Sequence, residues 1–296
     1  MKILLVFNPW ACHKRAAKWL PEIEAAFIKY GVEFDLSLTD YPEHGIEIVA
    51  QADLTQYDGI VAAGGDGTLF EVINGYYRNH RSKDIPLGIL PIGTGNAFAR
   101  DLNLDAGHWP EAVRIISEGK LRNVDVGHFK SHGQDYYFLN ILGVGFVADV
   151  TKAASKLKFF GNLSYTLGVF YRTIRLKADQ MQVTVDGKLI ERACTFVEIS
   201  NTRYTSNFLM APQARIDDGL LDITIAGKLG RLKLLKSFPK IFTGDHIYLD
   251  EVETCQAQTI KIETSTAKVL TPDGELVGIT PVEINCLAAA IRVFWR

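Results

Sequence analysis

Five consecutive residues, Gly64-Gly65-Asp66-Gly67-Thr68, have the types and spacing of a phosphate-binding turn. They follow an apolar run at residues 59–63 and precede a segment with helical periodicity, so they lie at a predicted strand-to-helix turn. Glycine lacks a Cβ, so its N–H group can approach an anion closely, and the following helix N-terminus favours negative charge. A carboxylate beside phosphates is repelled unless a divalent cation separates them, so Asp66 indicates Mg²⁺.

A second glycine-rich turn, Pro91-Ile92-Gly93-Thr94-Gly95-Asn96, follows another predicted strand at residues 86–92. As structure alone, it is a loop with a helix start at which Asn96 acts as the N-cap. As a functional element, it is a second wall of a phosphate site, to which Thr94 offers a hydroxyl. Neither turn has the Walker A or the G-x-G-x-x-G spacing, so the common nucleotide-binding motifs do not account for them.

The first 123 residues alternate between strand and helix patterns, which predicts a parallel sheet covered by helices on both faces. Ligands of such sheets bind at the carboxyl ends of the strands. Asn8, Thr39, the first glycine turn and Thr94 all lie at such ends. Each is a weak signal alone, but their convergence on one edge favours a binding site. The predicted strands are residues 3–7, 33–39, 59–63 and 86–92, and the predicted helices are 14–30, 43–52, the stretch after the first glycine turn, and 109–119.

After about residue 123 the chain becomes rich in strand patterns joined by short turns, interrupted by helical stretches at 147–175 and 231–243. The dipeptide Asp186-Gly187 between two strand patterns indicates a type I′ hairpin. We therefore expect an α/β domain at residues 1–123, a mostly antiparallel β-sandwich domain at 124–287, and a tail at 288–296 that packs back onto the first domain.

The composition narrows the class of partner. The formal net charge of the 296 residues is −2, which gives no general attraction to nucleic acid. The four cysteines lie far apart without a C-x-x-C pair, which is typical of a protein in the reducing cytoplasm. No apolar run reaches the ~18 residues that span a bilayer, so any membrane contact is expected to be peripheral.

The motifs together resemble the diacylglycerol kinase catalytic-domain family, which includes bacterial diacylglycerol kinases, sphingosine kinases and ceramide kinases. The resemblance extends over nearly the whole chain and adds three later matches to the two glycine turns. It implies an NAD-kinase-like α/β nucleotide-binding domain, a second β-sandwich domain, and an active site in the cleft between them. The later matches are Thr39-x-x-x-x-His44, Asp217-Asp218-Gly219-Leu220-Leu221-Asp222 and Asp273-Gly274-Glu275.

The resemblance also implies roles for the matching residues. Asn8 and Thr39 would line the ATP site, with Thr39 near the adenine. Asp273 and Glu275 would be the catalytic pair, and Glu275 is our choice for the group that takes the proton of the acceptor hydroxyl. Without the upstream motifs, the same tripeptide would be read as an exposed hairpin turn. The expected phosphate-binding set is Gly64, Gly65, Asp66, Gly67, Thr68, Glu71 and Thr94.

The resemblance also implies a structural Mg²⁺ site. Bacterial members of the family hold this ion at the segment that matches Asp217-Asp218-Gly219. Here Asp218 would supply a carboxylate, and Arg215 and Leu220 would supply backbone carbonyls. A plain turn that leads into a strand is the alternative reading. One departure from the family lies in the first loop, Asn8-Pro9-Trp10-Ala11-Cys12, where the family usually has Asn-Pro-x-Ser-Gly.

The sequence thus predicts an ATP- and Mg²⁺-dependent lipid kinase whose acceptor is diacylglycerol. Phosphatidylglycerol, ceramide or a sphingoid base stay open as acceptors, and NAD kinase or a non-catalytic nucleotide-binding regulator are the alternative classes. We expect a cytoplasmic protein, peripheral on the inner membrane face, and a homodimer is compatible with the sequence. One group of basic residues has two readings, as ordinary solvated helix faces or as a rim that contacts an anionic membrane surface. These residues are Lys14, Arg15, Lys18, Arg100, Lys152, Lys156 and Lys158, beside Phe159-Phe160.

Overall fold

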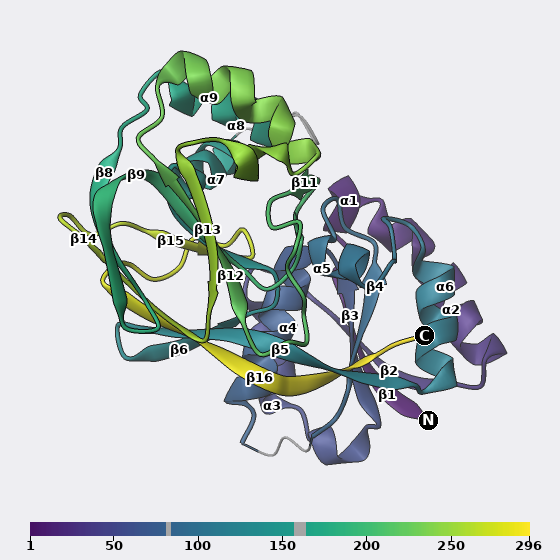
Figure 1. Ribbon diagram of the computed structural model, residues 1–296. Helices are drawn as coiled ribbons and strands as arrows, with labels where there is room; N and C mark the ends of the chain where they lie inside the picture. Colours follow the sequence, from purple (N-terminus) through teal and green to yellow (C-terminus); the bar gives the residue numbers. More distant parts are fainter. Residues whose placement is uncertain (81–83, 157–163) are drawn as a thin grey trace. The chain divides into compact units, whose positions relative to one another are not determined.

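The computed structural model describes residues 1–80, 84–156 and 164–296 of the chain (Figure 1). They divide into two compact units. The first, here called the α/β unit, contains Met1–Val124 and Ala289–Arg296, and the second, the β-rich unit, contains Asp125–Ala288. The strands β5 (Leu121–Ser131) and β16 (Val282–Phe294) have residues in both units.

The α/β unit is built on four parallel strands in the order β4-β3-β1-β2. The end of β16 adds to this sheet in parallel, where Val293 pairs with Leu87 of β4. Every residue of β3 and β4 is buried, as expected for a parallel sheet with covered faces. The strands are β1 (Lys2–Phe7), β2 (Glu33–Leu38), β3 (Gly59–Gly64) and β4 (Leu87–Pro91).

Helices cover both faces of this sheet, which confirms the predicted fold class (Figure 1). The helices α2 (Ala16–Lys29) and α6 (Trp109–Glu118) pack together on one face, and α3 (His44–Gln51) and α4 (Asp66–Arg78) on the other. The predicted helix at 14–30 begins two residues late, because Lys14 has φ +67° and ends a short first helix that precedes it. The short elements are α1 (Ala11–Lys14), η1 (Leu54–Gln56) and α5 (Ala97–Asp101).

The β-rich unit is mostly antiparallel, as predicted, with strand order β13-β12-β9-β8-β14-β16. Strand β7 pairs with β9, and β15 pairs with β7. The predicted hairpin joins β8 to β9, and both Asp186 and Gly187 have the positive φ that a type I′ turn requires. The strands are β6 (Gln134–Phe138), β7 (Ile141–Gly145), β8 (Asp179–Val185), β9 (Lys188–Ser200), β10 (Tyr204–Thr205), β11 (Phe208–Leu209), β12 (Leu221–Gly227), β13 (Val252–Ala257), β14 (Thr259–Thr264) and β15 (Leu270–Pro272).

Short helices form a separate layer in this unit. The helices α7 (Phe146–Lys156) and α8 (Ser164–Thr173) occupy the first predicted helical stretch, and the break expected at Gly161-Asn162 lies outside the described residues. The second stretch is α9 (Arg231–Ser237) followed by η3 (Phe238–Phe242), and then by η4 (Asp245–Tyr248). In the ranges that the structure describes, no helix is both long and apolar enough to cross a bilayer.

The central strand β9 separates two different environments within the β-rich unit. Val197 and Ile199 are fully buried in the main core, where they pack among side chains of the neighbouring strands. Side chains alternate along a strand, so Phe196 and Glu198 point to the opposite face. There they line a pocket together with residues of α7, α8, α9, η3 and η4.

Candidate active site

The carboxyl ends of β1 and β3 bring several of the predicted phosphate-site residues together. Asn8 follows β1, and its N–H donates to the Ala63 carbonyl at 2.9 Å. The Asn8 Nδ2 donates to the Thr68 hydroxyl at 3.0 Å, so this side chain links the end of β1 to the start of α4. Thr39 lies beside them, buried, with its N–H bonded to the Phe7 carbonyl at 2.9 Å. Asn8, Thr39 and Thr68 therefore share one edge of the sheet.

The two glycine turns approach each other so closely that a side chain does not fit. A Cβ on Gly93 would lie 2.2 Å from the Gly65 Cα, and a Cβ on Gly64 would lie 2.2 Å from the Thr68 hydroxyl oxygen. The Ile92 N–H also donates to the Gly64 carbonyl at 3.2 Å. The turns form one unit of backbone, in which glycine is required by contact.

Asp66 fastens these two turns together. Its Oδ1 accepts the Ala97 N–H at 2.7 Å, at the start of α5. Burial raises the pKa of Asp66 from 3.8 to about 6, against the opposing effects of N–H groups from Ala97, Phe98 and Asn96 and of the Arg100 charge. The carboxyl group that the sequence assigns to the phosphate site thus also bonds to backbone of the second turn.

Asn96 holds the second turn in shape from within. It adopts the left-handed conformation with φ +52°, its Oδ1 accepts the Gly93 N–H at 3.0 Å, and its Nδ2 donates to the Gly93 carbonyl at 2.8 Å. The buried Asn96 and Gly93 leave Thr94 at the exposed tip between them. Thr94 is therefore accessible, as a residue that contacts a phosphate must be.

Glu71 has partners that the sequence did not suggest. Its two carboxylate oxygens accept the N–H groups of Glu43 and Gly45, each at 2.9 Å, at the start of α3. A carboxylate at a helix N-terminus satisfies backbone donors and interacts favourably with the helix dipole. We expected Glu71 to hold phosphates, but these contacts give it a part in positioning α3.

In the altered first loop, a side-chain oxygen also accepts a backbone N–H group. The Asn8 Oδ1 accepts the Trp10 N–H at 2.9 Å.

The two residues of the predicted catalytic pair, both in the β-rich unit, lie in different environments. Asp273 is buried, and its carboxylate accepts three N–H groups, those of Leu139 at 3.0 Å, Asn140 at 2.9 Å and Ile141 at 3.0 Å. Three donors hold this group in place. Asp273 therefore anchors the turn that carries Glu275.

Glu275 is presented to solvent by that turn. Its side chain is exposed, and its N–H donates to the Pro272 carbonyl at 2.8 Å. Asp273 and Gly274 have φ values of +47° and +87°, so two successive left-handed residues reverse the chain directly before it. Of the two acids, Glu275 is the more accessible.

The predicted Mg²⁺ ligands lie on a compact acidic turn. The Asp218 Oδ1 accepts the Leu220 N–H at 3.1 Å, and the Gly219 N–H donates to the buried Asp125 at 2.7 Å. Burial and the nearby Asp218 charge raise the pKa of Asp222 to about 6. In kind, the Asp218 carboxylate and the backbone carbonyls of this turn are the oxygen donors that a divalent cation takes. Among the described residues there is no group of three or more His, Cys, Asp or Glu side chains placed to hold a metal.

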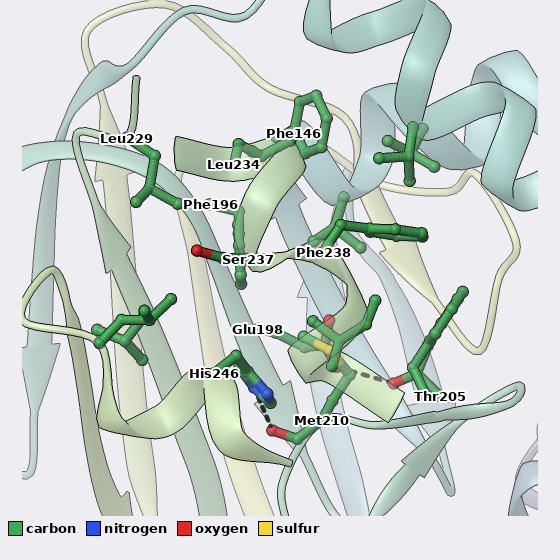
Figure 2. A pocket seen from close by; sticks show the side chains of 17 residues that line it. Phe146, Phe196, Glu198, Thr205, Met210, Leu229, Leu234, Ser237, Phe238 and His246 are labelled. Carbon is green, nitrogen blue, oxygen red and sulfur yellow. Dashed lines mark hydrogen bonds between the residues drawn. The ribbon is translucent and has the colours of Figure 1, made fainter. Parts of the chain in front are cut away.

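The sequence did not predict the apolar pocket on the far face of β9. Its empty volume, including the part open to solvent, is about 690 Å³. Thirteen of its 17 lining residues are apolar, and Figure 2 shows Phe146, Phe196, Phe238 and Leu234 around the space. The polar exceptions are Glu198, Thr205, Ser237 and His246.

Asp66→Asn is expected to remove a pH dependence of stability. The pKa in the folded protein, about 6, lies above the ordinary 3.8, so the folded state keeps a proton that the unfolded chain has lost. The contribution of Asp66 to the free energy of unfolding is full below about pH 4 and falls by about 2–3 kcal/mol as the pH rises through 6. Urea unfolding at pH 4 and pH 7 without divalent cations measures the difference between the variant and the wild type. Parallel pH profiles would contradict this account of Asp66.

Asp273→Asn is expected to lower the free energy of unfolding by about 2–4 kcal/mol, because an amide cannot accept all three N–H groups. The matched control is Glu275→Gln, two residues away and exposed, which should change the stability by less than ~0.5 kcal/mol. Urea denaturation of both variants checks this. Equal stability of the two would show that Asp273 does not anchor the turn.

Comparisons with known proteins place the whole chain among relatives. A family model described as "Diacylglycerol kinase catalytic domain" matches residues 2–129. A second, described as "YegS C-terminal NAD kinase beta sandwich-like domain", matches residues 140–295. The chain is also similar to a crystal structure described as a diacylglycerol kinase of Bacillus anthracis, with a TM-score of 0.81, 26% identity, and coverage of 100% of this chain and 97% of that one.

Curated relatives match over almost their full length. A diacylglycerol kinase of Mycobacterium tuberculosis is 31% identical over 296 residues, which is 99% of this chain and 94% of that protein. A diacylglycerol kinase of Bacillus subtilis is 29% identical over 292 residues, which is 98% of this chain and 94% of that protein. The resemblance inferred from the motifs is confirmed: the chain belongs to the diacylglycerol kinase family and is a phosphotransferase of that family.

Proposed function

We propose that this protein is an ATP- and Mg²⁺-dependent lipid kinase that phosphorylates the free hydroxyl of diacylglycerol and so forms phosphatidate. The observation that carries the proposal is the apolar pocket of the β-rich unit. NAD, the acceptor of the competing enzyme class, is polar and charged, and such a molecule would lose its hydration in a pocket with this lining. An acyl chain gains about 0.8 kcal/mol for each methylene buried there.

The α/β unit supplies the groups that hold ATP in this proposal. Backbone N–H groups of Gly64 to Gly67 and the N-terminus of α4 receive the phosphates, since these donors converge at the end of β3. The hydroxyls of Thr68 and Thr94 and the amide of Asn8 add side-chain contacts, and Thr39 lies toward the adenine. Mg²⁺, when bound, neutralises charge on the phosphate oxygens.

The β-rich unit supplies the proton acceptor. The lipid hydroxyl oxygen forms a bond to the γ-phosphorus, the bond from that phosphorus to the β–γ bridging oxygen breaks, and ADP leaves. The hydroxyl proton passes to the Glu275 carboxylate. Asp273 does not touch the acceptor in this scheme, because its oxygens are bonded to backbone N–H groups, and it acts by positioning the Glu275 turn. The Asp218 carboxylate, with the Arg215 and Leu220 carbonyls, would hold a second, structural Mg²⁺.

The helical layer beside the pocket suggests how the protein reaches a membrane lipid. Tyr171 on α8 and Ile174 directly after it are 56% and 66% exposed, and Leu232 on α9, which packs against α8, is 75% exposed. Exposed basic residues lie on the same elements and after them: Arg175, Lys177, Lys236 and Lys240. Apolar side chains beside Lys and Arg suit an anionic bilayer, at about 1 kcal/mol per charge.

This surface differs in part from the one predicted from the sequence. Lys158 and Phe159-Phe160 lie outside the described residues, while the exposed side chains of α8 and α9 were not predicted. The inner faces of these helices line the pocket through Val169 and Leu234. We therefore propose that the protein docks through this helical layer on the cytoplasmic face of a membrane.

Radiolabelled ATP offered with diacylglycerol, phosphatidylglycerol, ceramide, sphingosine and NAD tests the proposed reaction. We expect label in phosphatidate. Glu275→Gln should lower kcat at least ~100-fold without weakening ATP binding, since it removes the proton acceptor alone. Glu283→Gln, an exposed acid on β16, is the matched control and should keep wild-type turnover. Label in NAD alone or in no acceptor would overturn the proposed lipid kinase activity. Normal turnover of Glu275→Gln would overturn the role of Glu275 as the proton acceptor.

Co-sedimentation with vesicles tests the docking surface. The wild-type protein should sediment with phosphatidylglycerol vesicles much more than with phosphatidylcholine vesicles. Replacing Tyr171 and Ile174 together by Ser should weaken sedimentation at least ~10-fold, because two exposed apolar side chains no longer enter the bilayer. Leu189→Ser, an exposed apolar residue on β9, is the control. Equal sedimentation with phosphatidylglycerol and phosphatidylcholine vesicles, or unchanged sedimentation of the double variant, would contradict docking by this surface.

A further inference from the structure

Glu198 is an unusual group in the apolar pocket, and neither the proposed catalysis nor the sequence motifs account for it. It lies on β9, is 1% exposed, and points into a space bounded mainly by aromatic and aliphatic side chains (Figure 2). The Thr205 hydroxyl donates to the Glu198 Oε1 at 2.8 Å. Within the described part of the chain, that hydroxyl is the one hydrogen-bond partner of this carboxyl group.

The other residues that line the pocket offer the Glu198 carboxyl group no charged partner. His246 on η4 is the second titratable side chain that lines the pocket, and its Nε2 lies 3.0 Å from the Met210 carbonyl. Burial lowers the pKa of His246, so the ring is neutral at neutral pH. The lining residues from α7, α8, α9, η3, β10, β11 and β13 are all uncharged.

A buried carboxyl without a cation keeps its proton more readily than one in water. Burial raises the pKa of Glu198 to about 7, against the opposing effect of the Thr205 hydrogen bond. In the neutral acid, Oε1 is the acceptor that Thr205 already uses, and the proton on the other oxygen is a donor. Buried donors nearly always have an acceptor, so the pocket offers a hydrogen bond that a ligand can complete.

We propose that Glu198, oriented by Thr205, forms a polar subsite that recognises an ester carbonyl oxygen of an acylglycerol whose chain fills the pocket. The ligand is then held by two kinds of contact, methylenes against the apolar walls and one carbonyl oxygen against the acid proton. This rests on the proposed function for the identity of the lipid. A sphingoid base would instead require the ionised carboxylate opposite its ammonium group, which burial among apolar side chains disfavours.

Direct binding, measured without ATP, tests the subsite separately from catalysis. The probes are radiolabelled 1,2-dioctanoylglycerol and its diether analogue, which has the same chains and hydroxyl but no ester carbonyl. The wild-type protein should bind the diester about tenfold more tightly than the diether at pH 6. This preference should disappear toward pH 8.5, as Glu198 loses the proton that makes the bond.

Two variants separate recognition from structure. Glu198→Gln keeps an N–H donor and cannot titrate, so it should retain the diester preference at every pH. Glu198→Leu should bind both probes equally and independently of pH. Circular dichroism and thermal unfolding confirm that each variant is folded, and if Glu198→Leu does not fold, the pH profiles of the wild type and Glu198→Gln decide alone.

Three results would overturn the subsite: equal binding of diester and diether by the wild type, a diester preference that survives in Glu198→Leu, or binding of sphingosine that tightens as the pH rises. Absence of binding of either glycerolipid would overturn it as well. Failure of the proposed function looks different. In that case the diester still binds in a Glu198-dependent way, but no labelled phosphate reaches it from ATP.

Discussion

The structure depends on carboxylates that accept backbone N–H groups where the chain turns or a helix begins. Such donors have no partner within their own helix or turn, and leaving them buried and unbonded costs about 1–3 kcal/mol each. Asp66 meets this need at the start of α5, Glu71 at the start of α3, and Asp273 at the turn after β6. Each of these acids belongs to a motif with a functional reading, so the residues that carry the chemistry also position it.

Because the same residues both position the site and belong to its motifs, the two glycine turns tolerate little change in residue type. The Gly65 and Gly93 backbones touch, and Asp66 joins the first turn to the helix that follows the second. The two walls of the proposed phosphate site therefore form one piece of backbone. Preorganised N–H donors of this kind need no rearrangement at the moment of reaction. Placing a carboxyl group in this buried position lowers the free energy of unfolding at neutral pH, and the raised pKa of Asp66 reflects that cost.

The sequence was sufficient for the fold class and for the edge of the sheet where the phosphate residues gather. Parallel strands place their carboxyl ends together, so Asn8, Thr39 and the glycine turns follow from strand order alone. The partners of Asp66 and Glu71 did not follow, because each bond joins residues more than 25 positions apart. The pocket was missed because its walls come from residues 146–252, and each of them looks like ordinary core. One signal was available: Glu198 interrupts an otherwise apolar run, Phe196-Val197-Glu198-Ile199.

The central claim is that the acceptor lipid lies in the pocket of the β-rich unit. Photocrosslinking of a diazirine-bearing diacylglycerol, followed by mass spectrometry of the peptides, tests it most directly. We expect adducts on lining residues such as Phe208, Met210 and Phe238, competed away by unlabelled diacylglycerol. Adducts confined to the α/β unit, or labelling that unlabelled diacylglycerol does not reduce, would contradict the account.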